Sequence, residues 1–242
     1  KRLFELPRSN WQDYNKKLIS KGGGLFSRAS KSINLTPEMK KWLGTSQQSM
    51  TPNQLIHNVL KMPVDLIWNG GIGTYVKASS ENNLEVGDKA NDSLRVNGKQ
   101  LRCKVIGEGG NLGFTQIARI EYGMTGGISL TDFIDNSAGV DCSDHEVNIK
   151  ILLNALMAEK VLKVDDRNSL LESMTESVSK MVLENNYRQT QAISLCEAEA
   201  DARSIEYRRL ISHYESLGKL DREIEFIPND EILAERRATG NT

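Results

Sequence analysis

The sequence predicts an α/β fold in which strands and helices alternate first and a region of helices follows. Two short apolar runs break abruptly into glycine and a carboxamide, V-I-G-E-G-G-N at residues 105–111 and D-F-I-D-N-S-A-G-V at residues 132–140. Buried parallel strands end in this way where their carboxyl ends open onto a ligand crevice. From residue 147 onward, apolar residues instead recur at helical spacing. We therefore expect a parallel sheet with a ligand site at its edge, followed by helices.

Two helices and a strand are expected between residues 36 and 74. Thr36-Pro37 and Thr51-Pro52 each place an N-cap hydroxyl before a proline at the first helical position. The second helix leads into the apolar run V-D-L-I-W at 64–68, which ends in N-G-G-I-G-T at 69–74. Glycines just past a buried strand let a ligand or another backbone come close, and they fit a plain turn equally well. The earlier K-G-G-G run, at 21–24, favours a loop over a phosphate cradle because no strand precedes it.

A hairpin and a second strand are expected next. Asn97-Gly98 stands between L-R-V and K-Q-L-R-C-K-V-I, and this dipeptide is a strong signal for a two-residue hairpin. The second arm ends in G-E-G-G-N-L-G at 107–113, which is similar to the dinucleotide fingerprint except that its third glycine falls one place late. Helical spacing then predicts a helix over 115–124. Strand, glycine turn and helix are therefore all expected here.

A third strand is expected over 128–134, with a break at D-N-S-A-G over 135–139. Ser143 and Glu146 match the S-x-x-E capping box, which predicts a helix start. The N-terminus of that helix offers free backbone N–H groups and a hydroxyl, which suit a carboxylate or a phosphate. His145-Glu146 does not make a zinc motif, because position 149 is isoleucine where H-E-x-x-H needs its second histidine. We expect no metal site.

The remaining residues are expected to be nearly all helix. Apolar stripes run over 149–157 and 170–182, with a break near Asn185-Asn186, and interleaved charges over 197–217 are typical of solvated helix faces. The chain therefore divides into two expected parts. These are the sheet-containing residues 1–146 and a helical region, 147–242, that forms a bundle or an arm around the first part.

Composition limits the class of protein. The 242 residues carry 31 Lys and Arg against 32 Asp and Glu, so no nucleic-acid partner is expected. No apolar stretch approaches the roughly 18–20 residues that span a bilayer, and no signal segment opens the chain. The three cysteines are widely spaced, which fits reduced thiols, and Cys103 fits a small core residue. We expect a soluble cytoplasmic protein with no membrane partner and, because it starts at Lys1 without methionine, a piece of a longer chain.

The expected strand ends converge on one edge of the sheet, where ligands of such sheets bind. Residues 69–74, 107–113 and 135–141 supply carboxamides, a hydroxyl and backbone there, with no acid/base pair and no nucleophile. Such groups can hold a cofactor without doing its chemistry. Asparagine amides suit a nicotinamide carboxamide or ribose hydroxyls, because they pair donors with acceptors.

In this order, the motifs resemble the distal half of the nucleotide-binding domain of glutamate dehydrogenases. That family's motifs are P-A-A, E-G-A-N-x-P-T-T and N-A-G-G-V-T-V-S. The sequence of these motifs is most similar to that of the large NAD-specific glutamate dehydrogenases of bacteria. The similarity includes the opening segment L-F-E-L-P-R-S-N-W. The resemblance implies a partial Rossmann-like sheet, NAD as cofactor and a homo-oligomeric full-length enzyme. It also implies oxidation of L-glutamate to 2-oxoglutarate and ammonia.

The resemblance implies roles for single residues. Asn111 and Asn136 match the asparagines of E-G-A-N and N-A-G-G, which lie beside the nicotinamide half of the cofactor. Ser143 matches the family's last serine, which holds the distal carboxylate of glutamate. Gly110 and Gly113 depart from the family's alanine and proline, and the second departure exchanges a rigid turn for a permissive one. The expected cofactor-binding residues are Asn69, Gly70, Gly109, Asn111 and Asn136.

The groups that the family uses for chemistry are not found in this sequence. Its catalytic lysine and aspartate and its G-x-G-x-x-G turn belong to preceding segments, so the chain is expected to contribute no catalytic residue and to be inactive alone. Two other functions stay open. A non-enzymatic interaction module would tolerate the loss of Asn111, Asn136 and Ser143, whereas another dinucleotide-dependent oxidoreductase would act on a different amino or hydroxy acid.

Overall fold

The computed structural model describes residues 9–239. Most of the opening segment that resembles the bacterial enzymes, Leu3–Arg8, lies outside these residues, as do the last three residues of the chain. The described chain forms two compact units, and the boundary between them passes through two strands and one helix. Unit 1 contains the residues up to 67, 73–106 and 118–129. Unit 2 contains residues 68–72, 107–117 and the residues from 130 onward.

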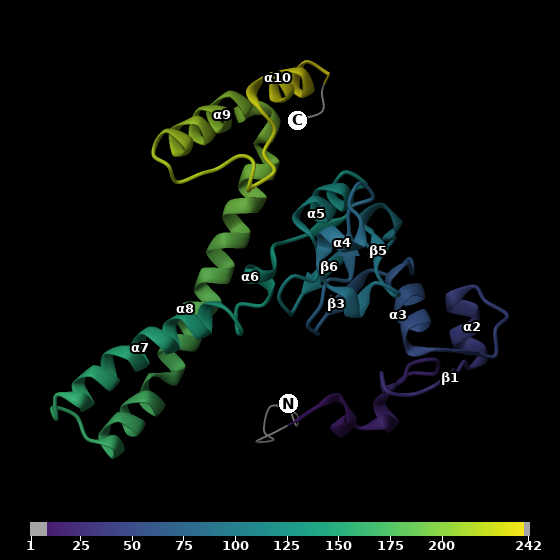
Figure 1. Cartoon of the computed structure of the whole chain (residues 1–242), viewed down its shortest axis with the longest axis horizontal. Helices are drawn as coiled ribbons and strands as arrows, with labels where there is room; N and C mark the ends of the chain where they lie inside the picture. Colours follow the sequence, from purple (N-terminus) through teal and green to yellow (C-terminus); the bar gives the residue numbers. More distant parts are fainter. Residues whose placement is uncertain (1–8, 240–242) are drawn as a thin grey trace. The chain divides into compact units, whose positions relative to one another are not determined.

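Short elements dominate the first half of the chain and long helices dominate the second (Figure 1). The elements up to residue 129 are η1 (Trp11–Asp13), η2 (Lys16–Leu18), β1 (Ile33–Asn34), α2 (Pro37–Leu43), β2 (Ser49–Met50), α3 (Pro52–Leu60), β3 (Leu66–Asn69), β4 (Val76–Lys77), α4 (Asn83–Val86), η3 (Lys89–Asn91), β5 (Val96–Asn97), η4 (Gly98–Gln100), β6 (Val105–Glu108), α5 (Gln116–Gly123) and β7 (Ile128–Ser129). The later elements are α6 (Asp132–Asp135), α7 (Asp141–Ala158), α8 (Val164–Ala198), α9 (Ala200–Ser216) and α10 (Asp230–Ala238).

The two predicted capped helices are confirmed as α2 and α3. Thr36 accepts a hydrogen bond from the Met39 N–H, and Gly44 ends α2 in the left-handed conformation with φ 63°. Thr51 forms a full capping box with Gln54 at the start of α3. The two helices pack around a small core made of Ile33, Leu35, Met39, Met50 and Leu55. Local sequence signals were sufficient here because each cap is satisfied within four residues.

The α/β class is confirmed. Three strands form one sheet in the order β3-β6-β7, and β6 pairs with β7 in parallel, with Val105 opposite Ile128. The apolar runs at 64–68 and 105–108 therefore do form neighbouring strands, although each is only four residues long. β1 and β2 form a separate, two-stranded antiparallel sheet. Cys103, at 5% exposure, is a core residue as expected.

The hairpin predicted at Asn97-Gly98 is wrong. Val96 and Asn97 pair in parallel with Val76 and Lys77, some twenty residues earlier, and Gly98 begins a turn of 3-10 helix. A Cβ at Gly98 would lie 2.7 Å from the Ala118 carbonyl oxygen, so this glycine is needed for close packing and not for a hairpin turn. The long-range pairing overrides the local turn signal.

The predicted third strand is correct only at its start. β7 covers Ile128 and Ser129, and the residues expected to extend it form the single helical turn α6 instead. The predicted capping box is also wrong, because α7 begins at Asp141 after Val140, with no side-chain cap, and Ser143 is its third residue. Glu146 instead pairs with Lys150, one turn later on the same helix.

The predicted helical region is confirmed, but its predicted break is wrong. α8 runs without interruption through Asn185, whose side-chain N–H donates to Asp141 Oδ2 at 3.0 Å, so a tertiary contact with α7 uses the amide. α7 and α8 pack side by side as a helical hairpin (Figure 1). Among residues 9–239, no helix is both long enough and apolar enough to cross a membrane. The three cysteines are free thiols, as expected.

Acid is expected to weaken unit 1 through Asp88. The Asn91 side chain donates to Asp88 Oδ2 at 2.7 Å and the Thr74 N–H donates to the same oxygen at 2.9 Å. These bonds, the Asn91 amide first, lower the pKa of Asp88 below its usual value of 3.8. A carboxylate with a lowered folded-state pKa contributes stability above the unfolded pKa and loses it as the pH falls through the folded one. The urea concentration at the midpoint of unfolding should therefore decrease as the pH is lowered from about 5 to about 3. This decrease should be smaller for the Asp88→Asn variant. An equal decrease in the variant would contradict this assignment.

Candidate cofactor site

Two of the predicted cofactor residues lie in direct contact. Asn136 Nδ2 donates a hydrogen bond of 2.7 Å to Asn111 Oδ1, across a sequence separation of 25 residues. Asn111 lies in the turn after β6, and Asn136 is the residue that ends α6. The bond leaves the Asn111 amide nitrogen and the Asn136 amide oxygen without a hydrogen-bond partner among the described residues. An amide nitrogen can donate to a primary carboxamide, and an amide oxygen can accept from one.

Asn69, at the end of β3, is packed against the same turn. Its side-chain Nδ2 is buried and has no hydrogen-bond partner among the described residues. A Cβ at Gly113 would collide with this nitrogen and would lie 3.0 Å from Glu108 Oε2. The segments after β3 and β6 therefore meet at Asn69 and Gly113, and the segment after β6 meets the end of α6 through Asn111 and Asn136, where a third strand end had been expected.

The two departures from the family motif have packing causes. A Cβ at Gly110 would lie 2.6 Å from the Gly71 carbonyl oxygen, so the turns after β6 and β3 approach too closely for an alanine. At Gly113 the exchange of proline for glycine was expected to make the turn permissive. Instead the left-handed residue is Leu112, with φ 57°, and Gly113 is needed for space beside Asn69. Backbone strain and side-chain crowding therefore fall on adjacent residues, Leu112 and Gly113.

The Trp68 ring lies against Gly107 of β6 and against Gly109 just after it. A Cβ at Gly107 would lie 2.5 Å from the Trp68 ring, and one at Gly109 would also lie 2.5 Å from it. The indole is half exposed, at 56%, so it presents one face to solvent beside the turn. Gly70 has more room, since a Cβ there would meet Trp68 at an ordinary 3.5 Å. The predicted residues Gly70 and Gly109 therefore both flank this indole.

Sequence reasoning missed the carboxylates that hold the turn. Glu108 is fully buried and accepts a hydrogen bond of 3.1 Å from the Phe114 N–H. The Glu108 N–H in turn donates to Asp135 Oδ2 at 2.9 Å, and the Leu112 N–H donates to Asp132 Oδ2 at 2.7 Å. The available signal was the acidic residue that stands close before each carboxamide, in G-E-G-G-N and in D-F-I-D-N.

Ser143 lies in the first turn of α7 and is half-buried. Acidic residues surround it in sequence, Asp141 and Asp144, and both lie in the same turn. The Cys142 and Asp144 N–H groups are occupied by the Ser137 and Val140 carbonyls, at 2.9 Å each. The expected anion site therefore retains the Ser143 hydroxyl but fewer free backbone donors than the sequence suggested.

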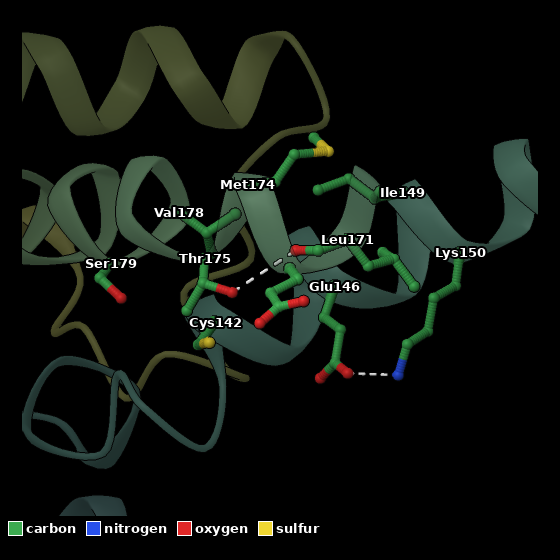
Figure 2. Close-up of a pocket in the computed structure, with 10 residues that line it drawn as sticks. Cys142, Glu146, Ile149, Lys150, Leu171, Met174, Thr175, Val178 and Ser179 are labelled. Atoms are coloured by element: carbon green, nitrogen blue, oxygen red, sulfur yellow. Dashed lines mark hydrogen bonds and ion pairs between the residues drawn. The ribbon is translucent and has the colours of Figure 1, made fainter. Parts of the chain in front are cut away.

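A separate pocket lies between α7 and α8 (Figure 2). Its volume is about 410 Å³, and Ile149, Leu171, Met174 and Val178 make its wall apolar. Glu146 and Lys150 stand at its rim and pair with each other, as Figure 2 shows, so their charges are mutually neutralised. None of the six predicted site residues lines this pocket, although Cys142, the neighbour of Ser143, does.

The site after β3, β6 and α6 combines side-chain amides with carboxyl groups, and these carboxyl groups accept backbone hydrogen bonds. In α/β sheets, nucleotide cofactors bind at the carboxyl ends of the strands, which is where these carboxamides lie.

The chain belongs to the family described as bacterial NAD-glutamate dehydrogenase, catalytic domain, which matches residues 1–196. It is 59% identical over 239 residues to a NAD-specific glutamate dehydrogenase of Pseudomonas aeruginosa, with 99% of the chain covered. It is 55% identical over 235 residues to one of Halomonas elongata, with 97% covered, and 46% identical over 246 residues to one of Mycobacterium tuberculosis, with 99% covered. The chain spans 15% of the length of each of these relatives.

Proposed function

We propose that this chain is the part of a NAD-dependent glutamate dehydrogenase that holds the nicotinamide side of the cofactor. The whole enzyme would oxidise L-glutamate to 2-oxoglutarate and ammonia and pass a hydride to NAD. In this proposal residues 1–146 are the distal part of a Rossmann-like NAD-binding domain, and residues 147–242 are a helical region that follows it in the sequence. The chain is inactive alone, and the full-length enzyme is a cytoplasmic homo-oligomer that binds neither nucleic acid nor membranes.

The hydrogen bond between Asn111 and Asn136 is the observation that supports this proposal most directly. It brings together two residues that correspond, by their resemblance to the family's motifs, to the asparagines beside the nicotinamide, and it leaves the Asn111 amide nitrogen and the Asn136 amide oxygen unused. A nicotinamide carboxamide needs one group of each kind. Asn69, Gly70 and Gly109 would line the crevice beside it, and Ser143 would bind the distal carboxylate of glutamate through its hydroxyl.

Alanine substitutions in the full-length enzyme test the assignment. Asn111→Ala and Asn136→Ala should each raise the KM for NAD about tenfold, because each removes one hydrogen bond to a desolvated carboxamide. Ser143→Ala should raise the KM for glutamate and leave the KM for NAD unchanged. Initial rates of glutamate oxidation, with each substrate varied in turn, separate the two effects.

Asn168→Ala is the matched control, because Asn168 is an exposed asparagine on α8 whose amide oxygen only accepts from Arg167. It should leave both KM values unchanged. Wild-type KM for NAD in the Asn111 and Asn136 variants would contradict the cofactor assignment and favour an interaction module. Turnover of another amino or hydroxy acid in preference to glutamate would favour a different oxidoreductase.

A further inference from the structure

Two aspartates of α6 hold the turn that carries Asn111. Asp132 Oδ2 accepts from the Leu112 N–H at 2.7 Å, and Asp135 Oδ2 accepts from the Glu108 N–H at 2.9 Å. The two backbone donors stand on either side of Asn111 in the sequence. Both acceptors are carboxyl oxygens of aspartates, and hydrogen bonds to a carboxylate are roughly twice as strong as those between neutral groups. The turn is therefore fixed to α6 at two points.

The same helical turn also positions the second amide. Asn136 follows Asp135 directly, and its N–H donates to the Asp132 carbonyl at 2.7 Å. Ile134, between the two aspartates, is buried at 3% exposure and anchors α6. One rigid element thus carries the Asn136 amide and both carboxylates that determine where Asn111 lies.

The conformation of the turn explains why it needs this support. Leu112 has φ 57°, a left-handed conformation that is strained for every residue except glycine. Its side chain is 66% exposed, so packing does not hold it there. The bond from the Leu112 N–H to Asp132 is a contact that compensates this strain, and its loss would let the turn relax away from Asn136.

We infer that Asp132 and Asp135 are positioning residues that set the relative placement of the Asn111 and Asn136 amides, and hence the affinity for the nicotinamide carboxamide. This inference rests on the proposed function. Neither aspartate needs to touch the cofactor, because both act through backbone N–H groups of the turn. Removal of either carboxylate separates the paired amides, and the site then presents its donor and acceptor at the wrong spacing.

Kinetics of the full-length enzyme test this role. Asp132→Ala and Asp135→Ala should each raise the KM for NAD about tenfold, with the KM for glutamate unchanged at saturating NAD. Asp132→Asn and Asp135→Asn retain an acceptor oxygen of the same size and should restore most of the affinity. Asp166→Ala is the control, since Asp166 is an exposed acidic residue on α8, and it should leave both KM values unchanged.

Amide hydrogen exchange of the full-length variants supplies a second readout. Faster exchange in the peptide that spans residues 108–114 is expected for both alanine variants, with no change in the peptide that contains α10. If an alanine variant does not fold, the asparagine variant at the same position is measured, and slightly faster exchange with a raised KM for NAD is still expected. An equal rise in both KM values together with a lower kcat, with unchanged hydrogen exchange over residues 108–114, would overturn the inference.

Failure of the proposed function and failure of the positioning role would give different results in these experiments. If Asn111→Ala and Asn136→Ala leave the KM for NAD unchanged, the proposed function fails. If those variants raise this KM while Asp132→Ala and Asp135→Ala leave it at the wild-type value, only the positioning role fails.

Discussion

Replacing Arg95 with methionine is expected to lower the free energy of unfolding of the chain by about 3–5 kcal/mol, which is the usual cost of breaking a buried charged network from one side. The Arg95 side chain is only 1% exposed. It donates to the Thr74 carbonyl at 2.8 Å, to the Asp88 carbonyl at 2.6 Å and to Asp92 Oδ1 at 2.6 Å. Methionine fills much of the volume but removes the Arg95 donor from each of these acceptors, of which, within the described part of the chain, only the Asp88 carbonyl keeps another, the Asn91 N–H.

Urea unfolding of the 242-residue chain measures this loss, and Arg203→Met is the matched control. Arg203 forms ion pairs of 2.8 Å with Glu199 and 2.6 Å with Glu206, but its side chain is 49% exposed. Exposed pairs of this kind contribute about 1 kcal/mol or less. A loss in the Arg95 variant no larger than in the Arg203 variant would show that the buried network does not stabilise unit 1.

Replacing Gly113 with alanine is expected to damage stability and cofactor binding together. The added methyl group would collide with Asn69 Nδ2 and crowd Glu108 Oε2, and both atoms lie in a buried region. Overpacking of this kind costs about 1–3 kcal/mol. Asn69 has to move, so the proposed crevice also changes shape. We expect a lower urea midpoint for the chain and, in the full-length enzyme, a raised KM for NAD.

Gly123→Ala provides the control for this substitution. Gly123 ends α5, and a Cβ there would meet nothing within 4 Å. Alanine at such a position is expected to be neutral or to stabilise by about 0.4–1 kcal/mol, because it restricts the unfolded chain. Similar unfolding midpoints for the two alanine variants would refute the packing role assigned to Gly113.

The accuracy of the sequence-based predictions followed the range of the interactions involved. The caps at Thr36 and Thr51 were predicted correctly, because each is completed by a backbone N–H three residues away. The hairpin at Asn97-Gly98 was not, because β5 pairs with β4 instead of with the next segment of the chain. The cap at Ser143 failed for a local reason, because α7 begins two residues earlier at Asp141 and Glu146 pairs with Lys150 one turn later.

The sequence by itself determined the α/β class, the capped helices, the helical second half and the family to which the chain belongs. These features depend on the local spacing of residues and on the order of the motifs, which can be determined from the sequence without knowledge of long-range contacts. Only the tertiary structure showed that Asn111 contacts Asn136, that Gly113 is required by Asn69, and that Asp132 and Asp135 hold the turn. Those contacts join segments some 20 to 44 residues apart, and their partners are set by the approach of β3, β6 and α6 in space.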